Sequence, residues 1–333
     1  MIKLSLCIPT YNRGQFIGET IESIIVQATD EVEIVISDNG SNDNTEELIR
    51  EYQGKFPRIR YFRWDNNVGA DRNFLKVIEL ATGTYCWFMG SDDRAESGAL
   101  SHVLDQLDKH TELCGASVNQ AIYTPDLNAE LKGVPIAGGK LESDLIFNDT
   151  EECFSNLGLY FGYLPGQIVN RSLWNKVVKT ETLEPYFNAF VHVYVIGRML
   201  KINPNWLYIH KKCVGYRSGN DSFLQEGGVY KRQVIAHASF EKIVRDLFGL
   251  GTRTYNEVLL MALTGYMRAD LVNFKANGAS AGLQLKLFNL YSRIYWRFPF
   301  YWFKVFPIFL IPNRFIVPFR NFHRYGLRGT VRP

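Results

Sequence analysis

The 333-residue sequence predicts an α/β fold with a mixed, mainly parallel central sheet, followed by a helical region rich in basic and aromatic residues. Over about the first hundred residues, short apolar runs alternate with amphipathic stretches, which is the pattern of parallel strands connected by helices. From about residue 229 to 273 the apolar spacing is helical. The length allows one large domain with an appended region. We expect a first domain at 1–225, with halves at 1–110 and 111–225, and a C-terminal region at 226–333.

The elements of the first half follow from these patterns in order. Residues 4–9 form the first strand, and residues 14–28 form a helix whose apolar face consists of Ile17, Ile21, Ile24, Ile25 and Ala28. Further strands are expected at 32–36, 59–62 and 85–89, and a helix at 71–80. Asp43 can cap the intervening helix, with Glu46 as its capping-box partner. Polar or glycine-rich sequence follows each strand, at the edge where open α/β sheets bind ligands.

Beyond Leu113 the alternation weakens. Residues 123–148 form a long irregular segment, of the kind that often serves as a lid or binding loop. An aromatic, glycine-containing stretch at 159–166 precedes an expected strand at 167–169. A helix is expected at 191–200 and a further strand at 206–210.

The C-terminal region has an unusual charge distribution. Ten Lys and Arg residues follow Asp270, the last acidic residue, so residues 271–333 carry a formal charge of +10 and residues 1–270 carry −7. A basic end on an acidic body indicates an anionic partner, either lipid headgroups or nucleic acid. The basic residues alternate with Trp296, Phe298, Phe300, Tyr301, Trp302, Phe303, Phe306 and Phe309, and Pro299, Pro307 and Pro312 interrupt any continuous helix.

We therefore favour broken amphipathic segments that lie in a membrane interface and contact an anionic membrane surface. The alternative is an aromatic core packed across the first domain, with solvated arginines outside. Nucleic acid is not expected as a partner, although a steep salt dependence of DNA or RNA binding would support it. The five scattered cysteines read as reduced core residues, and we see neither a signal peptide nor a transmembrane helix, which together predict a cytoplasmic location.

Four polar clusters are expected to meet at one edge of the sheet. They follow the four predicted strands and comprise residues 9–13, 37–43, 67–73 and 91–93. Taken singly, each has an ordinary explanation: an adjacent Asp pair is more often a turn or helix cap than a metal site, Asp38 is equally a turn residue, and Arg72 a solvated helix residue. Their order and spacing together point to function.

Together the clusters resemble the family 2 glycosyltransferases, which have a nucleotide-sugar-binding fold of the kind called GT-A. The resemblance covers residues 2–110 and rests on residues 7–13, 36–43 and 67–73 and on the acidic pair Asp92 and Asp93. Residues 69–75, 85–87 with 90–93, and Arg217 with 220–223 are similar to abequosyltransferase-like enzymes of bacterial O-antigen assembly. This likeness implies a transferase that binds a nucleotide-sugar.

The acidic pair has the chemistry that such a donor needs. A departing nucleoside diphosphate gains negative charge, which a divalent cation held by carboxylates stabilises. Asp92 and Asp93 supply hard oxygen ligands suited to Mn²⁺ or Mg²⁺, and Arg72 offers a second cationic contact to the diphosphate. The fuller acidic motif of the family has an aspartate two positions before the first member of this pair, and this chain has Gly90 there. We therefore expect the metal to rest mainly on Asp93, with Asp92 contacting ribose or metal; loss of metal dependence is the alternative.

The remaining donor-site residues come from the resemblance. It assigns nucleotide binding to Pro9, Thr10, Tyr11, Asp38 and Asp43, and we add their neighbours in the same clusters, Arg13, Asn39, Gly69 and Ser91. Arg217 and Asp221 either order a loop over the diphosphate or pair with each other on the surface.

The catalytic base is not evident. The acceptor hydroxyl loses a proton as it attacks, and many family members use an Asp from a Glu-Asp pair that is missing from residues 186–192 here. His192, at the start of a predicted helix, is our candidate because its pKa lies near neutrality. A buried, hydrogen-bonded histidine is the equally weighted alternative, with Asp221 and Glu152 as substitute bases.

The sequence therefore predicts an inverting, metal-dependent glycosyltransferase. It would transfer a sugar, plausibly a deoxyhexose, to a lipid-linked oligosaccharide at the cytoplasmic face of a bacterial inner membrane, to which it binds peripherally. Inversion follows only from the resemblance. A non-catalytic nucleotide-sugar-binding partner in a membrane glycan-assembly complex is the alternative. Nucleotidyl transfer is less favoured, because no glycine-rich activation loop with a following lysine occurs near the N-terminus.

Overall fold

A computed structural model describes residues 1–132, 136–139 and 141–316 of the chain. It divides into two compact units, Met1–Asp221 and Ser222–Pro333. The domain boundaries expected from the sequence, at 110 and 225, stay predictions. The arginines at 320, 324, 328 and 332 lie outside the described residues.

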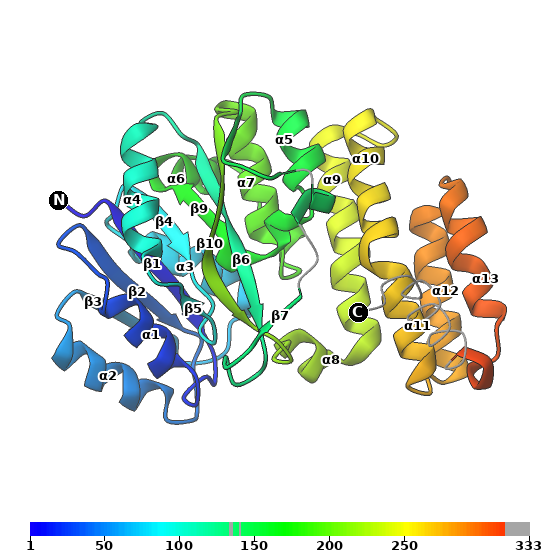
Figure 1. The fold of residues 1–333 in the computed structure, drawn as a ribbon, viewed down its shortest axis with the longest axis horizontal. Helices are drawn as coiled ribbons and strands as arrows, with labels where there is room; N and C mark the ends of the chain where they lie inside the picture. Colours follow the sequence, from blue (N-terminus) through cyan, green and yellow to red (C-terminus); the bar gives the residue numbers. More distant parts are fainter. Residues whose placement is uncertain (133–135, 140, 317–333) are drawn as a thin grey trace, which may run out of the picture. The chain divides into compact units, whose positions relative to one another are not determined.

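The first unit contains a single ten-stranded sheet (Figure 1). Its strand order is β3 (Ile59–Arg63), β2 (Val32–Asp38), β1 (Leu4–Thr10), β4 (Tyr85–Phe88), β9 (Gln167–Asn170), β6 (Gly115–Tyr123), β10 (Trp206–Arg217) and β5 (Arg94–Ala95). β1 pairs in parallel with β2 and β4, and β6 pairs in parallel with β10. β9 is antiparallel to both β4 and β6, so these two strands run in the same direction. The mixed, mainly parallel sheet predicted from the sequence is confirmed.

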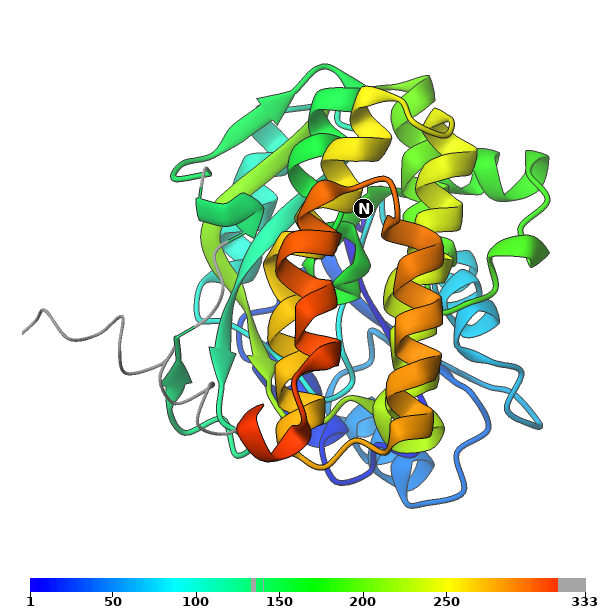
Figure 2. The same ribbon diagram turned by 90° about the vertical axis from the view of Figure 1, so that its right-hand side faces the viewer.

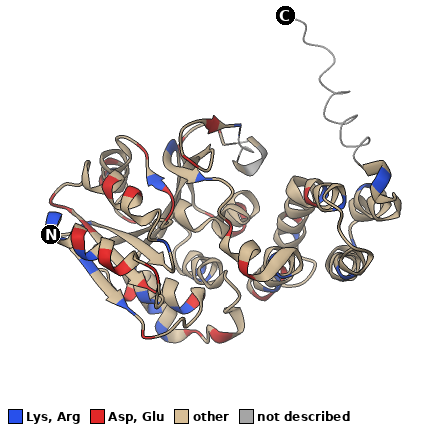
Figure 3. Ribbon diagram, turned by 90° about the horizontal axis from the view of Figure 1, so that it is seen from below, with Lys and Arg blue, Asp and Glu red and all other residues tan. Residues whose placement is uncertain are grey.

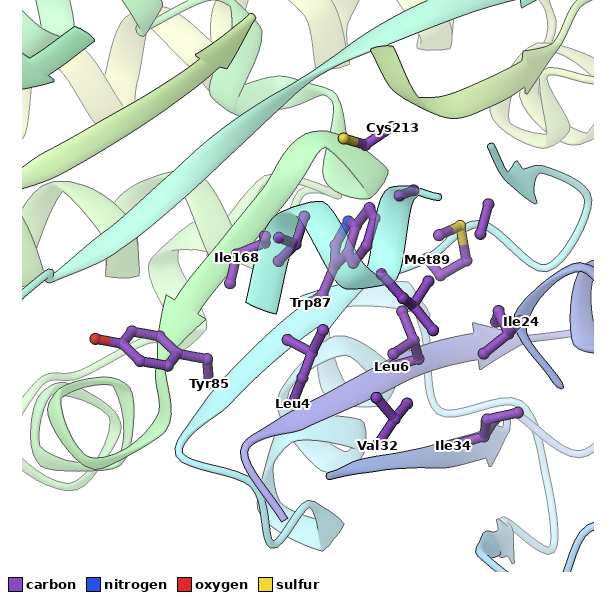
Figure 4. Close-up of a cluster of buried hydrophobic side chains, with 14 of the residues drawn as sticks. Leu4, Leu6, Ile24, Val32, Ile34, Tyr85, Trp87, Met89, Ile168 and Cys213 are labelled. Carbon is purple, nitrogen blue, oxygen red and sulfur yellow. The ribbon is translucent and has the colours of Figure 1, made fainter. Parts of the chain in front are cut away.

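The first half folds as its hydrophobic pattern predicts. β1 and β2 are buried along almost their whole length, as expected for central strands covered on both faces. Alternate residues point to opposite faces. Leu4, Leu6 and Trp87 enter a core that also contains apolar residues of α1 (Ile17–Ile25) and α4 (Ala99–Lys109), and Figure 4 shows their side chains close together. Phe88 instead contacts Trp174 of α6 (Arg171–Thr180).

Two expectations for this half are wrong in detail. The first helix spans Ile17–Ile25, shorter than the predicted 14–28. The helix α2 (Thr45–Lys55) has Asn44 at its N-cap position, without a side-chain cap, and Glu46 faces Arg50 and Arg63 rather than completing a capping box. The Asp43 carboxylate does accept a hydrogen bond from the Thr45 backbone N–H, at 3.1 Å. It also accepts one from Gly14, so it joins two loops instead of capping one helix.

The second half of this unit departs further from expectation. β6 was not predicted, and β10 continues to Arg217, beyond the predicted end at residue 210. The pairing of β10 with β6 shifts register between Ile209 and Val214, where three exposed residues interrupt the apolar alternation. The segment at 123–148 contains β7 (Glu130–Leu131), the 3-10 turn η1 (Ile136–Gly139) and β8 (Leu145–Phe147), so it is not structureless.

The rest of this unit is helical. It contains α3 (Ala70–Leu80), α5 (Thr150–Leu157), α6, α7 (Val191–Ile202) and the 3-10 turns η2 (Tyr160–Gly162), η3 (Leu164–Gly166) and η4 (Glu184–Tyr186). α3 packs on β1 and β2 and also contacts α7, which in turn packs on α6.

The C-terminal unit is entirely helical in its described residues. It contains α8 (Ser222–Gln233), α9 (Phe240–Phe248), α10 (Arg253–Ala262), α11 (Arg268–Ala276), α12 (Ala281–Tyr295) and α13 (Phe306–Leu310), with π-helical segments η5 (Val234–Ser239), η6 (Leu263–Met267) and η7 (Tyr301–Val305). Figure 2 shows the long helices lying side by side. None of the helices in the described part of the chain combines the length and the apolar character of a membrane-spanning helix.

Candidate functional site

The carboxyl ends of three strands and the first helix meet around one side chain, Arg217. This arginine is the last residue of β10, and its side chain is 5% exposed. Its Nε donates to the carbonyl oxygen of Asp92, after β4, and its Nη1 to that of Pro125, after β6, each at 2.7 Å. Its Nη2 donates to Glu19 of α1 at 2.6 Å, and the guanidinium lies over the Phe16 ring. The ends of β4, β6 and β10 and the helix after β1 are thereby held at one place.

Asp93 lies buried within this junction. Its Oδ1 accepts a hydrogen bond from the Arg217 backbone N–H at 2.9 Å, and its Oδ2 accepts one from the Tyr163 hydroxyl at 3.3 Å. Its carbonyl oxygen accepts the Thr20 hydroxyl at 2.6 Å. Burial, with the neighbouring Asp92 as a second cause, raises the pKa of the Asp93 carboxyl well above its usual range.

Asp92 is the more accessible member of the pair. Its side chain is 20% exposed, and its Oδ2 accepts a hydrogen bond from the Asn220 amide and lies 4.0 Å from Nε of Arg13. Burial raises the pKa of Asp92, although Arg13 and Asn220 act in the opposite direction. Two adjacent carboxylates with raised pKa values would both be stabilised in their charged form by a cation.

The acidic pair fits a divalent cation as part of its ligand set. Within the described ranges, no three His, Cys, Asp or Glu side chains come together as a metal site. Mg²⁺, however, commonly takes only one or two carboxylates from the protein and completes its shell with water and substrate phosphates. Asp92 presents the more open oxygens, while both oxygens of Asp93 accept hydrogen bonds from the protein. The expectation that the metal rests mainly on Asp93 stays a prediction.

Gly90 is explained by the packing of Asp93. A Cβ atom at position 90 would lie 2.5 Å from Oδ2 of Asp93 and 3.3 Å from Oδ1 of Asp92. The contact with Asp93 is far shorter than a van der Waals distance, so any side chain at position 90 would require the Asp93 carboxylate to move. The absence of a side chain at position 90 therefore leaves the space that the buried Asp93 carboxylate occupies.

The loops after β1 and β2 form a polar cradle beside the pair. Asp38 is fully buried, and it accepts hydrogen bonds from the Ser41 backbone and hydroxyl and from the Tyr61 hydroxyl. Asn39 donates to the Asn67 side chain and accepts from the Val68 backbone, each at 2.9 Å. These contacts shape the loops, so in this structure Asp38 and Asn39 organise the cradle through protein contacts.

Other residues predicted to bind the nucleotide-sugar lie in the same loops. Thr10 is 2% exposed, and its hydroxyl is buried without a hydrogen-bond partner among the described residues. A buried hydroxyl without a partner is costly, and a ligand atom would satisfy it. Pro9 and Tyr11 flank it and are partly exposed. Arg13 lies in the same loop, where its backbone N–H donates to the Thr45 hydroxyl at 2.9 Å.

The remaining members of the strand-end clusters lie around the cradle. Gly69 directly precedes α3 and has φ of 92°, a positive value that favours glycine. Arg72 is exposed, and its guanidinium lies 5.3 Å from the centre of the Phe187 ring. Asp43 has a lowered pKa because hydrogen bonds from Thr45 and Gly14 outweigh its desolvation. Ser91 is buried directly before the acidic pair.

The geometry favours the buried-histidine interpretation of His192 over its role as a base. Its side chain is 1% exposed and packs against the rings of Phe74, Phe88 and Phe190. Nε2 lies 3.1 Å from the carbonyl oxygen of Phe161. Burial lowers the pKa of His192 to about 3. Nδ1 is buried without a hydrogen-bond partner among the described residues.

The two substitute bases lie in different surroundings. Glu152 is exposed in the first turn of α5. Asp221 is partly exposed and directly follows Asn220, the residue whose amide contacts Asp92. Of the three candidates, Asp221 therefore has the firmest connection to the acidic pair.

Asp71 is a residue that sequence reasoning did not assign to the site. It lies in the first turn of α3, and its carboxylate accepts hydrogen bonds from the backbone N–H groups of Ala189, at 2.8 Å, and Val191, at 3.0 Å. Ala189 has φ of 75°, which few non-glycine residues adopt. Asp71 thus connects the start of α7 to α3. The adjoining Asn73 donates to the carbonyl oxygen of Ser37, at 2.8 Å.

The chain is similar in sequence to known glycosyltransferases. Residues 5–162 match the family described as glycosyl transferase family 2. The chain is 32% identical over 277 residues to Abequosyltransferase RfbV of Salmonella typhimurium, which covers 77% of this chain and 80% of that protein. It is also 35% identical over 107 residues to the GalNAc(5)-diNAcBac-PP-undecaprenol beta-1,3-glucosyltransferase of Campylobacter jejuni, covering 32% of this chain and 35% of that protein.

Solved structures share the fold at low sequence identity. TarS 1-349 of S. aureus in complex with UDP aligns with a TM-score of 0.62 at 16% identity, covering 90% of this chain and 81% of that chain. A longer TarS chain aligns with a TM-score of 0.61, and there this chain spans 49% of its length.

Proposed function

This chain belongs to glycosyl transferase family 2, and we propose that it transfers a sugar from a nucleotide-sugar to a hydroxyl of a lipid-linked oligosaccharide, with inversion of the anomeric centre. The GT-A type fold expected from the sequence is confirmed. The observation that carries the proposal is the acidic pair at the end of β4, which lies at the same sheet edge as the Thr10 cradle. The resemblance to an abequosyltransferase supports a deoxyhexose as the sugar and bacterial surface polysaccharide as the product.

The acidic pair Asp92 and Asp93 acts, in this proposal, on the departing nucleoside diphosphate. A divalent cation, Mn²⁺ or Mg²⁺, would neutralise the charge that develops on the departing diphosphate. We propose that Asp92 holds the cation with the donor phosphates and that Asp93 supports it from its buried position. We propose that Arg13, 4.0 Å from Asp92, and Arg72, in the first turn of α3, contact the same phosphates. The Thr10 hydroxyl and the loops around Asp38 and Asp43 bind the nucleoside.

A base must accept the proton of the acceptor hydroxyl as it attacks. We propose Asp221 for this step because it adjoins Asn220 and is partly exposed, whereas the buried ring of His192 has a pKa of about 3. Replacing Asp221 by Asn keeps the shape and removes the basic oxygen. We expect kcat to fall on the order of 100-fold while the Kd for the donor stays unchanged. An Asp221→Asn enzyme with normal kcat would exclude this residue as the base.

The acceptor accounts for the proposed location. A lipid-linked oligosaccharide is presented at a membrane, and we propose that the C-terminal unit binds peripherally to the cytoplasmic face of the inner membrane. The exposed aromatic side chains of Trp296, Trp302 and Phe303 support this contact. The relative from Campylobacter jejuni carries an undecaprenol-linked acceptor in its name, which supports a similar acceptor class here.

The proposed donor site is tested by thermal shift with UDP-, GDP-, CDP- and dTDP-sugars, each with and without Mn²⁺. We expect one nucleotide class to stabilise the protein, and to do so mainly when metal is present. Asp92→Asn should abolish the metal-dependent part and lower transfer on the order of 100-fold. Asp105→Asn, an exposed carboxylate on α4, is the matched control and should change neither. Donor binding without any transfer would instead support a non-catalytic nucleotide-sugar-binding partner.

A further inference from the structure

The C-terminal unit contains an open pocket of about 490 Å³ that the proposed donor site does not use. It runs along α9, whose first turn contributes Glu241 and Lys242, and its other lining residues come from the start of α10 and the end of α12. Four of its lining residues are the cations Lys242, Arg245, Arg293 and Arg297, against one acidic lining residue, Glu241. Figure 3 shows basic residues along the helices of this unit.

Only two of these cations are neutralised by nearby acids. Arg245 pairs with Glu241 at 3.1 Å and lies 3.6 Å from Asp246, and Lys242 pairs with Asp246 at 2.6 Å. Within residues 222–316, Arg293 and Arg297 make no ion pair. A pocket with two uncompensated guanidinium groups attracts an anion, and the planar donor fork of arginine matches phosphate oxygens.

The pocket also has an apolar rim. Leu250 and Trp296 line it and are 56% and 58% exposed. The Arg297 guanidinium lies 5.1 Å from the centre of the Trp296 ring, and the Trp302 indole N–H donates to the Trp296 carbonyl oxygen at 2.8 Å. The neighbouring Phe303 is 77% exposed. Large exposed aromatic side chains beside arginines are characteristic of surfaces that enter the headgroup region of a membrane.

We propose that this pocket binds the phosphate of an anionic phospholipid headgroup, with Arg293 and Arg297 as the phosphate ligands. Leu250 and Trp296 would then lie at the boundary between headgroups and acyl chains. This inference rests on the proposed membrane contact of the C-terminal unit and gives that contact a specific site. It also distinguishes lipid recognition from a diffuse attraction between a basic surface and an anionic bilayer.

A charge-matched pair of double variants tests the site. Arg293→Ala/Arg297→Ala removes both phosphate ligands, and Lys286→Ala/Lys304→Ala removes two exposed cations of the same unit outside the pocket. Flotation of the full chain with phosphatidylglycerol vesicles measures binding. We expect the Kd of the pocket variant to rise on the order of tenfold or more, and that of the control by less than about threefold. Equal losses in both variants would overturn the specific site in favour of diffuse attraction.

Soluble ligands identify the source of the phosphate. A short-chain phosphatidylglycerol, held below its micelle concentration, should bind saturably and change the intrinsic tryptophan fluorescence of the protein, and the pocket variant should lose this response. Short-chain phosphatidylcholine and inorganic phosphate should have little effect. Inorganic phosphate binding as tightly as the lipid would overturn the lipid assignment.

Donor hydrolysis, measured in parallel without a membrane, separates the two proposals. It should be normal in the pocket variant whether or not the lipid site exists. Its absence from the unmodified protein would count against the transferase function instead.

Discussion

Replacing Arg217 by lysine separates two interpretations of this residue, as a ligand of the diphosphate and as a junction between strand ends. The arginine donates to two carbonyl oxygens at 2.7 Å and is 5% exposed. A lysine keeps the charge, but its single ammonium group reaches only one of these oxygens. One buried, charge-assisted hydrogen bond is therefore lost, worth about 1.5–3 kcal/mol. The pair with Glu19 adds little, because Glu19 is half exposed.

We therefore expect Arg217→Lys to lower the free energy of unfolding by about 2–3 kcal/mol without any ligand, a fall in Tm of about 4–12 °C. Differential scanning calorimetry of the ligand-free protein measures this. Arg198→Lys is the control, since Arg198 binds Glu181 through two nitrogens but is 38% exposed, and we expect less than about 1 kcal/mol there. Unchanged melting of Arg217→Lys, together with a raised Kd for the nucleotide, would refute the junction and favour the diphosphate contact.

Further predictions concern the packing of the first unit. Gly90→Ala places a methyl group against Asp93 and should cost about 1–3 kcal/mol and most of the transfer activity, whereas Gly54→Ala, on open helix surface, should be neutral or stabilising in urea unfolding. Asp71→Ala leaves two buried backbone N–H groups at the start of α7 without an acceptor and should lower the unfolding free energy by about 2–4 kcal/mol. Asp71→Asn should cause a smaller loss. His192 binds its proton in the unfolded chain near pH 6.5 but in the folded chain only near pH 3, so its contribution to stability is lost as pH falls between these values, by up to about 1.4 kcal/mol per pH unit. His192→Gln should reduce the number of protons taken up on unfolding by up to one, which lowers the slope of the unfolding free energy against pH in this range. An unchanged slope would contradict the buried, neutral ring.

The acidic pair was predictable because its signal is local. A short apolar run predicts β4, and the polar residues that follow it must lie at the carboxyl edge of the sheet. The same logic placed the loops after β1 and β2. What the pattern could not supply was the difference between the two carboxylates. Burial of Asp93 depends on Tyr163 and Arg217, which approach from distant parts of the chain.

The strands β6 and β10 in the second half of the sheet were harder to predict from the sequence, for a physical reason. β6 carries Asn119 and Gln120 in its middle, and both line a surface pocket, so its sequence lacks a clean apolar alternation. β10 is interrupted by the exposed residues His210, Lys211 and Lys212 where its register shifts.

Of the site residues, His192 was the least predictable. A histidine near a helix start has the same sequence signature whether it faces a substrate or an aromatic core. Only the positions of Phe74, Phe88 and Phe190 around its ring distinguish the two.

The junction at Arg217 also bears on when the protein becomes competent during synthesis. Its partner Glu19 lies 198 positions earlier in the chain, and Asp92 lies 125 positions earlier. Contacts of such long range close late, because the entropy of ordering the intervening chain must be overcome first. A nascent polypeptide that has left the ribosome only as far as β4 already contains both aspartates but not the strand that fixes them. Sugar-donor capture should therefore arise in one late step, once β10 has emerged and docked, rather than build up gradually with chain length.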